Sequence, residues 1–386
     1  MIKVLHITGG MNRGGAEVMV MDLLKNRSEN LHFDFLIHYK NSITKGDFDD
    51  EIKSQGSSLY YTRTLWDSGI YNYIKGLKKI FKTIRPDIVH IHMNSKSGVI
   101  ALAAKLAGIS SIITHSHADI KFRGSSVYRF LANKELWFQK ILINKYSTHF
   151  WGCSLEACKS LFQKSKSNHF QIINNAVDTE AYHAISADDV AAFKKNNLIP
   201  DDAILLGNIG RIVRHKNISF AIEVLNALVK NNSNYFLVYA GREDEPQYHK
   251  EIEDKVRQYK LDKHVAYLGL RDDVPLLMNA IDVFVGPSLQ EGFGLVAVEA
   301  QAAATPCILY KGFPKSVDMQ LQLVTFVDDF KIQNWVNAIL NVKSKKIPDK
   351  KTIKHTIRSL GFDSRMNAKE VCDFYITMNK STSYEK

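Results

Sequence analysis

The chain has 386 residues, of which 45% are hydrophobic and 24% are charged. This composition is that of a folded globular protein and excludes the disordered and fibrous classes. At roughly 100–200 residues per domain, the length predicts two domains. A formal net charge of +11 favours anionic partners, namely nucleic acid, anionic membrane surfaces or phosphorylated small molecules, without choosing among them.

Apolar runs separated by helix-like segments predict the strands. The N-terminal run MIKVLHITGG is too short for the hydrophobic region of a signal peptide and predicts a strand instead. The expected strands are residues 2–8, 33–39, 87–92, 111–114, 149–154, 203–210, 235–241, 265–269, 283–288 and 306–310. Continuous apolar strands between helices are typical of parallel sheets covered on both faces, so we expect a doubly wound α/β fold.

The first strand is followed by a loop rich in glycine. The loop GGMNRGG, which contains Gly14 and Gly15, precedes an amphipathic helix. Glycine permits close backbone approach to a ligand, and a helix N-terminus favours anions. The loop lacks G-x-G-x-x-G spacing and the chain lacks a P-loop motif, so it does not indicate a dinucleotide or P-loop site. Ordinary turn chemistry is the alternative, but four glycines with Arg13 favour a loop that faces a ligand.

Residues 75–85, KGLKKIFKTIR, predict a helix with lysines between apolar positions. A solvated helix face backed by core is the simpler interpretation, and a membrane-surface patch is the alternative. No membrane span is expected, because the longest apolar stretch, from Gly98, is interrupted by Lys105. Four cysteines without C-x-x-C spacing predict reduced thiols and a cytoplasmic protein.

The strand, glycine loop and helix of the N-terminus recur in AILLGNIGRIVRHKNISFAIEVLNALVKN, which starts at Ala203. Two such segments predict two Rossmann-like domains that face each other across a cleft, residues 1–175 and 176–363. The polar segment 174–203 contains no predicted strand and is expected to be the linker. Residues 364–378 show helical periodicity and begin a C-terminal segment, 364–386.

The second loop carries cations. Arg211 directly follows a strand and Lys216 comes five residues later. Arginine offers a planar fork and lysine a point charge, and together above a helix N-terminus they suit a diphosphate. Solvated loop residues are the alternative.

The segment GPSLQEGFGLVAVEAQAAATP, residues 286–306, contains two glutamates, Glu291 and Glu299. Its glycines predict a tight turn into an alanine-rich helix whose first amides point outward, where they favour a phosphate. The donor-facing backbone would be that of Gly292, Phe293, Gly294, Leu295 and Val296.

Three interpretations of the glutamate pair compete. Carboxylates near a helix start can simply complement its dipole. A glycosidase acid and nucleophile are disfavoured, because such a hydrolase does not need a parallel-sheet phosphate site. As acceptors for sugar hydroxyls on either side of a phosphate, the two carboxylates would bind a nucleotide sugar.

The sequence resembles the family-4 retaining glycosyltransferases, which have two Rossmann-like domains in the GT-B fold and an E-x7-E signature. Within them it is similar to transferases of bacterial capsule and exopolysaccharide clusters. The matching motifs are ITGGMNRGGAE, PDIVHIH, THSHAD, INNAVD, GRIVRHKN and LGLRDDVPLLMNAIDVFVGPSLQEGFGLVAVEAQAAATP. The last is highly specific, and the others occur in the expected order along nearly the whole chain.

The resemblance implies a role for each matching residue. Arg211 and Lys216 would hold the donor diphosphate and stabilise the leaving group. Glu291 would contact the transferred sugar, and Glu299 the ribose hydroxyls. The loop at Leu270 and Arg271 would hold the base.

In the first domain, which would bind the acceptor, a histidine of THSHAD would face the donor sugar. His117 is favoured slightly over His115, and either could instead be an ordinary buried histidine. Gly14 and Gly15 are also expected at the donor. By resemblance, residues 364–386 would form a helix that crosses back to the first domain.

The implied function is transfer of a hexose or N-acetylhexosamine, with retention, from a nucleotide diphosphate sugar, a UDP-sugar first, to a glycan or polyprenyl-diphosphate-linked acceptor. The cations and the helix N-terminus would stabilise charge on the leaving diphosphate, so we expect no metal and no cofactor. The protein would act in surface polysaccharide biosynthesis, in the cytoplasm or peripherally on the inner face of the cell membrane.

Other classes fit less well. A non-catalytic sugar-nucleotide-binding or partner subunit with the same fold is the main alternative. A nicotinamide-dependent oxidoreductase is disfavoured because the dinucleotide-binding fingerprint is missing. Nucleic-acid binding is disfavoured because the basic residues are not interleaved with aromatics.

Two alanines, Ala176 and Ala304, stand where the family usually has glycine.

Overall fold

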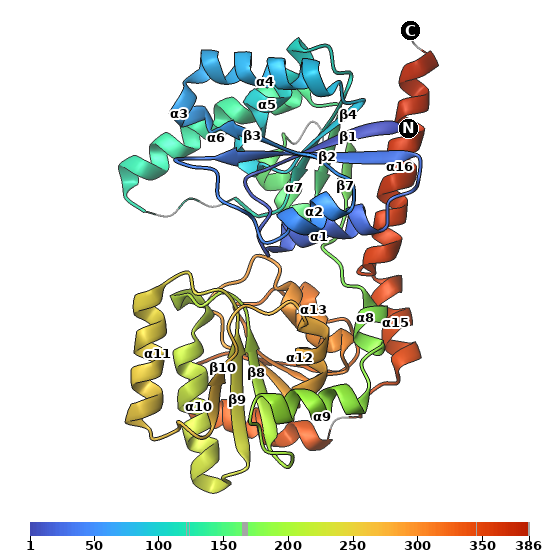
Figure 1. Cartoon of the computed structure of the whole chain (residues 1–386). Helices are drawn as coiled ribbons and strands as arrows, with labels where there is room; N and C mark the ends of the chain where they lie inside the picture. The colour runs from blue at the N-terminus through green and yellow to red at the C-terminus, as the bar shows by residue number, and fades with distance from the viewer. Residues whose placement is uncertain (121, 123, 164–168, 345, 385–386) are drawn as a thin grey trace. The chain divides into compact units, whose positions relative to one another are not determined.

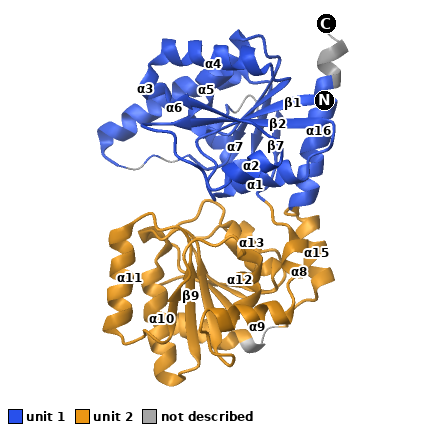
Figure 2. Ribbon diagram, viewed as in Figure 1, with its two compact units in different colours: residues 1–175, 364–386 blue, residues 176–363 orange. Residues whose placement is uncertain are grey.

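The computed structural model describes residues 1–120, 122, 124–163, 169–344 and 346–384 (Figure 1). The chain divides into two compact units, each with its own sheet (Figure 2). Unit 1 consists of residues 1–175 and 364–386, and unit 2 of residues 176–363. The predicted α/β fold with two doubly wound parallel sheets is confirmed.

Unit 1 contains a seven-stranded parallel sheet with the order β3-β2-β1-β4-β5-β6-β7. Its strands are β1 (Ile2–Thr8), β2 (Leu31–Tyr39), β3 (Leu59–Arg63), β4 (Ile88–Ile91), β5 (Ser111–Ser116), β6 (His149–Gly152) and β7 (Phe170–Ile172). Its helices are α1 (Gly15–Lys25), α2 (Asp49–Ser54), α3 (Leu65–Ser68), α4 (Ile70–Ile84), η1 (Asn94–Lys96), α5 (Ser97–Leu106), α6 (Ser126–Tyr146), α7 (Leu155–Leu161) and α16 (Ser364–Tyr384).

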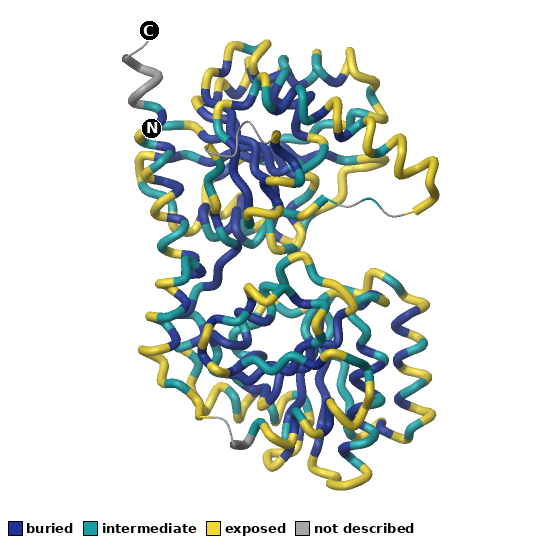
Figure 3. The backbone as a smooth tube through the Cα atoms, turned by 180° about the vertical axis from the view of Figure 1, so that it is seen from behind, coloured by how far each residue is buried: buried dark blue, intermediate teal, exposed yellow. Residues whose placement is uncertain are grey.

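Side-chain alternation along these strands fills two cores, one on each face of the sheet. Val4 and Phe35 belong to a core closed by α1 and by α16, which lie side by side. Leu5 and Leu36, each one residue further along, belong to the opposite core under α4 and α5. The strands therefore lie buried inside the unit (Figure 3), and the carboxyl ends of the strands are left to carry ligand-facing loops.

Unit 2 contains a six-stranded parallel sheet with the order β10-β9-β8-β11-β12-β13. Its strands are β8 (Ile204–Ile209), β9 (Tyr235–Ala240), β10 (Val265–Tyr267), β11 (Val283–Gly286), β12 (Cys307–Tyr310) and β13 (Val324–Val327). Its helices are α8 (Thr179–His183), α9 (Ala187–Asn196), η3 (Arg214–Lys216), α10 (Ile218–Asn231), α11 (Pro246–Gln258), α12 (Val274–Ala280), α13 (Leu295–Ala302), η4 (Lys315–Val317), α14 (Ile332–Leu340), η5 (Asn341–Ser344) and α15 (Lys350–Ser359).

The prediction that residues 174–203 form a linker is wrong for most of that segment. Residues 176–203 contain α8 and α9, and their Tyr182 and Phe193 side chains are buried in the core of unit 2. The segment reads as polar because only one side of each short helix faces that core. Three edge strands, β3, β7 and β13, were also not expected.

Among the described helices, none has the length and apolarity that a membrane crossing requires. Cys153, Cys158, Cys307 and Cys372 form no disulfide.

Candidate active site

Two loops at the carboxyl ends of β8 and β11 bring the predicted lysine and the first glutamate of unit 2 together. The Leu289 amide donates to the His215 carbonyl at 2.8 Å and joins the loops. Lys216 Nζ then lies 2.6 Å from Glu291 Oε1, with the two side chains 14% and 10% exposed. The lysine and the glutamate, which were assigned to different parts of a ligand, form one largely buried ion pair.

Glycines make room for the Lys216 side chain. Gly210 has φ 151°, and a Cβ there would lie 3.3 Å from Cε of Lys216. Gly241, at φ 146°, passes so close to Gly210 that a Cβ would lie 2.0 Å from the Gly210 carbonyl oxygen. Side chains at these two positions would displace the lysine or separate β8 from β9, so the loop requires glycine at both.

Helix α13 begins at the predicted turn. Gly294 is its N-cap, with φ 86° in the left-handed region, and a Cβ there would meet the Phe313 ring at 2.6 Å. The Glu291 amide donates to the Gly312 carbonyl at 3.0 Å, which holds the turn against the neighbouring loop. The first-turn amides of Leu295 and Val296 have no acceptor within a helix, which is the arrangement that binds anions.

Glu299 lies further along α13. Desolvation of its carboxyl raises its pKa to about 7, against the opposing effects of a hydrogen bond from Tyr182 and the charge of Lys216. The group therefore changes charge near neutral pH, and hydroxyl donors from a ligand would favour its ionised form.

Arg211 differs from Lys216 in exposure. Its side chain is 52% exposed, and Nη1 lies 3.2 Å from Asp244 Oδ2. Arg242 Nε also bonds Asp244, at 2.7 Å, and the two arginines lower the pKa of that carboxyl, Arg242 contributing more. Arg211 is thus anchored at one edge, with most of its guanidinium accessible.

The predicted base-binding loop follows β10. Arg271 makes a paired contact with Asp273, with Nε 2.7 Å from Oδ1, and its guanidinium stacks over Phe193 at 5.7 Å. Leu270 beside it is about half exposed. An ordered cation next to an exposed apolar side chain is a suitable platform for a flat ring.

In unit 1, the two predicted histidines have different environments. His115, on β5, is completely buried and its Nδ1 lies 3.2 Å from His90 Nε2. His117 follows β5, is partly exposed, and has its amide held by Asn94 Oδ1 at 2.7 Å. His115 has no exposed surface with which to contact a ligand, so its place among the donor-binding residues is not supported.

Two sets of three histidines are the metal-ligand candidates in the described part of the chain. They are His6, His90 and His92, and His92, His115 and His117, whose nitrogens lie within 4.8 Å of one another in each set. Gly14 and Gly15 form the N-cap and first residue of α1, as the glycine loop predicted, with no side-chain cap on the helix.

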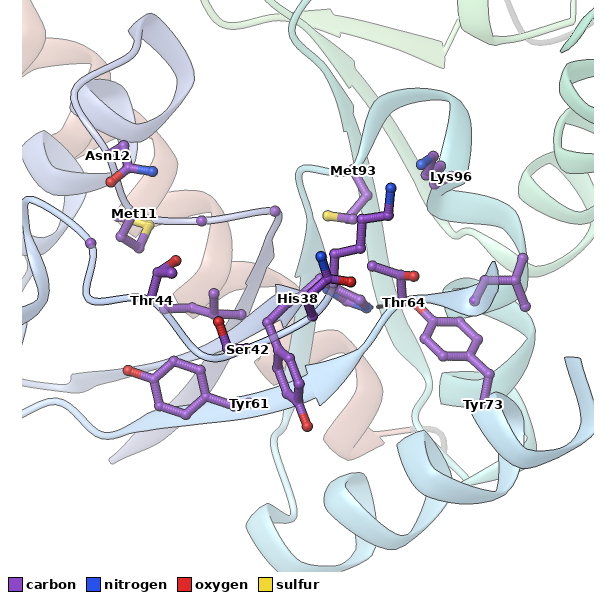
Figure 4. A pocket seen from close by; sticks show the side chains of 18 residues that line it. Met11, Asn12, His38, Ser42, Thr44, Tyr61, Thr64, Tyr73, Met93 and Lys96 are labelled. Carbon is purple, nitrogen blue, oxygen red and sulfur yellow. Dashed lines mark hydrogen bonds between the residues drawn. The ribbon is translucent and has the colours of Figure 1, made fainter. Parts of the chain in front are cut away.

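A cavity of about 510 Å³ in unit 1 was not foreseen (Figure 4). It lies at the carboxyl ends of β1, β2 and β4 and is lined by Tyr61, Tyr73, His38, Asn12 and Lys96, among others. His38 Nε2 bonds the Tyr73 hydroxyl at 2.6 Å, and burial lowers the pKa of His38 to about 4. Its size, its aromatic rings and the polar side chains around them suit a small polar ligand such as a sugar.

The sequence also matches known families. Residues 189–358 match the model described as glycosyl transferases group 1, and residues 47–150 match glycosyl transferase 4-like. The putative glycosyltransferase EpsF of Bacillus subtilis strain 168 is 32% identical over 380 residues, which are 97% of this chain and 96% of that protein. The chain belongs to the group 1 glycosyltransferase family.

Two further relatives of this glycosyltransferase are similar along nearly their whole length. The capsular polysaccharide biosynthesis glycosyltransferase CapH of Staphylococcus aureus is 27% identical, covering 98% of this chain and 99% of CapH. An Escherichia coli UDP-Gal:alpha-D-GlcNAc-diphosphoundecaprenol alpha-1,3-galactosyltransferase is 25% identical, and the match covers 98% of this chain and 96% of that protein. Anabaena Alr3699/HepE in complex with UDP and glucose shares the fold, with TM-score 0.71 and 17% identity over 100% and 99% of the chains.

The candidate site was partly predictable from the sequence. Motifs identified the residues of unit 2 because they follow strand ends. The cavity in unit 1 was missed, although polar side chains after three neighbouring parallel strands were an available signal for it.

Proposed function

We propose that this glycosyltransferase transfers a hexose or N-acetylhexosamine, with retention of configuration, from a UDP-sugar to a polyprenyl-diphosphate-linked or glycan acceptor in surface polysaccharide biosynthesis. The observation that carries the proposal is the buried Lys216–Glu291 pair beside the open N-terminus of α13. The pair offers a cation for the diphosphate and a carboxylate for sugar hydroxyls at one place.

On the donor side, Lys216, Arg211 and the first-turn amides of α13 stabilise the negative charge that grows on the diphosphate as the glycosidic bond breaks. Glu291 binds the transferred sugar, and Glu299 accepts from the ribose hydroxyls. Arg271 and Leu270 hold the base. A UDP-sugar is favoured because the E. coli relative is named for UDP-Gal and the Anabaena neighbour is in complex with UDP and glucose.

On the acceptor side, the cavity of unit 1 binds the accepting sugar. Tyr61 and Tyr73 provide ring faces, and Lys40 and Lys96 provide positive charge for an attached diphosphate. The diphosphoundecaprenol-linked substrate named for the E. coli relative has this combination of sugar and diphosphate. CapH is named for capsular polysaccharide biosynthesis, which supports the same class of pathway.

A lipid-linked acceptor requires access to a membrane surface, and unit 1 has a suitable face. Helices α4 and α6 pack on either side of α5. Exposed aromatic side chains include Tyr128, Phe130 and Trp137 on α6. Others are Trp66 on α3 and Tyr71 on α4. The first turns of α6 extend beyond the other helices of unit 1 (Figures 1 and 3).

Basic residues accompany these aromatics, namely Lys75, Lys78, Lys79 and Lys82 on α4 and Arg129, Lys134, Lys140 and Lys145 on α6. Aromatic rings with lysines are the composition of segments that lie on anionic bilayers. This peripheral contact would place the protein on the inner face of the cell membrane.

A donor screen tests the enzymatic proposal. The wild type is assayed with UDP-, GDP- and ADP-sugars for transfer or hydrolysis, beside Lys216→Met, Glu291→Gln and the matched control Lys230→Met. Lys230 lies at the far end of α10, near the amino ends of the strands. We expect turnover of a UDP-sugar, at least 100-fold lower kcat in the first two variants, and wild-type rates in the control. Failure of every donor would overturn the proposal.

Vesicle sedimentation tests the membrane face. The wild type should bind phosphatidylglycerol vesicles in preference to neutral ones, and less at high salt. The double variant Phe130→Ser/Trp137→Ser should lose binding, whereas Leu198→Ser, which removes an exposed apolar residue from unit 2, should keep it. Equal binding of the wild type to anionic and neutral vesicles would contradict this role.

A further inference from the structure

Helix α8 brings a tyrosine to the second glutamate of the candidate site. Helices α8 and α13 contact each other within unit 2. The Tyr182 side chain is 5% exposed and belongs to the core that α13 also lines. Its hydroxyl donates a hydrogen bond to the carboxyl of Glu299, which is itself partly exposed. The tyrosine therefore holds the carboxyl from the core side, and a ligand can reach the glutamate from the exposed side.

Packing does not require the hydroxyl of Tyr182. A phenylalanine ring would fill the same space, so the core of unit 2 would be complete without the oxygen. A buried tyrosine hydroxyl needs a hydrogen-bond partner. A hydrogen bond to a carboxylate is also stronger than one between two neutral groups. The benefit of the oxygen is therefore to be sought at Glu299.

The position of Tyr182 is fixed by contacts of the α8 backbone. Asn279 on α12 donates from Nδ2 to the Tyr182 carbonyl at 3.0 Å. Lys350 on α15 donates from Nζ to the next carbonyl, that of His183, at 2.7 Å. Two neighbouring helices thus hold α8 in place, and the phenol is presented to Glu299 without a search among conformations.

The phenol favours the ionised form of Glu299. Desolvation raises the pKa of this carboxyl to about 7, and the hydrogen bond from Tyr182 opposes the rise more than the charge of Lys216 does. Without the phenol, the pKa would rise further, and the carboxyl would be mostly protonated at neutral pH. A protonated carboxyl uses one oxygen as a donor, so it is a poorer acceptor for a pair of hydroxyls than a carboxylate is.

Other titratable side chains stand on the elements packed against α13. Glu180 on α8 pairs with Lys354 on α15, and Lys315 on η4 lies over the Phe326 ring at 3.8 Å. Also on these elements are His183 on α8, Lys350, Lys351, His355 and Arg358 on α15, and Cys307 and Tyr310 on β12. The effects that favour ionisation of the Glu299 carboxyl are those of Tyr182 and Lys216.

We infer that Tyr182 is a positioning residue whose hydroxyl holds the Glu299 carboxyl as an ionised acceptor for the ribose hydroxyls of the donor, and thereby sets how tightly unit 2 binds a ribonucleotide. The ribose as the ligand of Glu299 rests on the proposed function. The hydrogen bond between the two side chains does not, because both lie within unit 2. Being almost completely buried, Tyr182 acts through Glu299 and not by its own contact with the nucleotide.

Carbon-13 NMR of the full chain, labelled at the glutamate carboxyls, tests the hydrogen bond without any ligand. The Glu299 signal is assigned by its loss in Glu299→Gln. We expect its titration midpoint to rise by about one pH unit in Tyr182→Phe, because this variant keeps the ring and removes a donor to the ionised form. Equal midpoints in the wild type and Tyr182→Phe would overturn the inference.

Tyr235→Phe is the matched control. Tyr235 is also buried in unit 2, but it is the first residue of β9 and lies at the amino ends of the strands. Its variant loses a tyrosine hydroxyl at the end of the sheet opposite the donor loops. The Glu299 midpoint and nucleotide binding should both remain those of the wild type.

Calorimetric titration with UDP tests the consequence for binding. At about pH 6.5, Tyr182→Phe should bind UDP about tenfold more weakly than the wild type, because one unit of pKa changes the ionised fraction about tenfold. At about pH 9 the carboxyl is mostly ionised in both proteins, and the affinities should agree within about threefold. A distorted site would weaken binding at both pH values, so an equal loss at the two would overturn the inference.

A second nucleotide tests whether the ribose is involved. The analogue 2′,3′-dideoxy-UDP lacks both ribose hydroxyls and keeps the base and the diphosphate. Its affinity at about pH 6.5 should be the same in the wild type and Tyr182→Phe. Equal losses for UDP and the analogue would contradict a role through the ribose. If UDP binds neither protein while the Glu299 midpoint moves as expected, the proposed function fails and the hydrogen bond from Tyr182 stands.

Discussion

At the scale of single residues, the Lys216–Glu291 pair sets the energetics of the candidate donor site. Both side chains are largely out of water, so removing one charge leaves the other without compensation. We predict that Lys216→Met and Glu291→Gln each lower the free energy of unfolding by about 1–3 kcal/mol, and that the double variant loses less than the sum. Urea unfolding of the four proteins in the cycle measures this. Additive losses would show that the two charges do not interact.

Glu299 gives unit 2 a pH-dependent stability. Its pKa rises from 4.5 to about 7 on folding. Between these values the unfolded chain releases the proton and the folded chain retains it, so the group reduces stability as pH rises, by about 3 kcal/mol in full. Below pH 4.5 the effect is absent, and above pH 7 it is constant.

Glu299→Gln should therefore become more stable relative to the wild type as the pH is raised from 4.5 to 7.5. Unfolding curves at several pH values measure the difference, with Glu253→Gln on an exposed position of α11 as control. A constant difference across the range would mean that Glu299 ionises normally in the folded protein.

Residue motifs identified Arg211, Lys216 and both glutamates without any coordinates, since each stands at a strand end or a helix start. The ion pair between Lys216 and Glu291, which are 75 residues apart in sequence, could not be predicted, because it depends on the Leu289–His215 hydrogen bond between the two loops. Similarly, the H-x-H spacings predict histidines on one face, but the contact between them requires the order of β1, β4 and β5.

At the scale of elements, α13 ends in a left-handed residue that is not glycine. Ala304 has φ 65°, and its amide donates to the Gln301 carbonyl at 3.0 Å. The Thr305 amide donates to the Ala300 carbonyl at 2.8 Å, which completes a Schellman motif. The alanine that replaces the usual glycine of the family occupies a conformation that disfavours its Cβ.

We predict that Ala304→Gly raises the free energy of unfolding by about 0.5–1 kcal/mol, because relief of the left-handed strain exceeds the added entropy of the unfolded chain. Ala303→Gly, at the neighbouring C-cap with φ −80°, should instead lower it. Thermal unfolding of both variants measures the change. A loss of stability in Ala304→Gly would contradict the strain.

The strands that sequence patterns missed share a physical cause. β3, β7 and β13 are at sheet edges, where a strand has one neighbour and is not enclosed on all sides. These strands are short and mix polar with apolar residues, as in the segment FQI at 170–172. The central strands were all expected, because full burial requires continuous apolar runs.

At the scale of the whole molecule, the two units have separate cores. Helix α16 belongs to the core of unit 1. Ala368, Val371, Cys372 and Tyr375 are buried against the sheet of unit 1, and Tyr375 bonds His90 at 2.6 Å. We predict that a chain ending at residue 363 loses stability in unit 1 by at least several kcal/mol and leaves unit 2 unaffected. Calorimetry should show one transition lowered and one unchanged.

A chain ending at Asn379 retains these buried residues and is the control. Equal lowering of both transitions in the shorter chain would indicate that the units unfold as one.

The same arrangement has a consequence during synthesis. Unit 2 is continuous in sequence, so every residue of its core is translated before α16. Unit 1 begins first but cannot be completed until the last helix emerges, and until then the surface that α16 will cover is open. The first unit to be made is thus the last to be finished, and we expect chaperones that shield apolar surface to act on the nascent chain mainly at this unit.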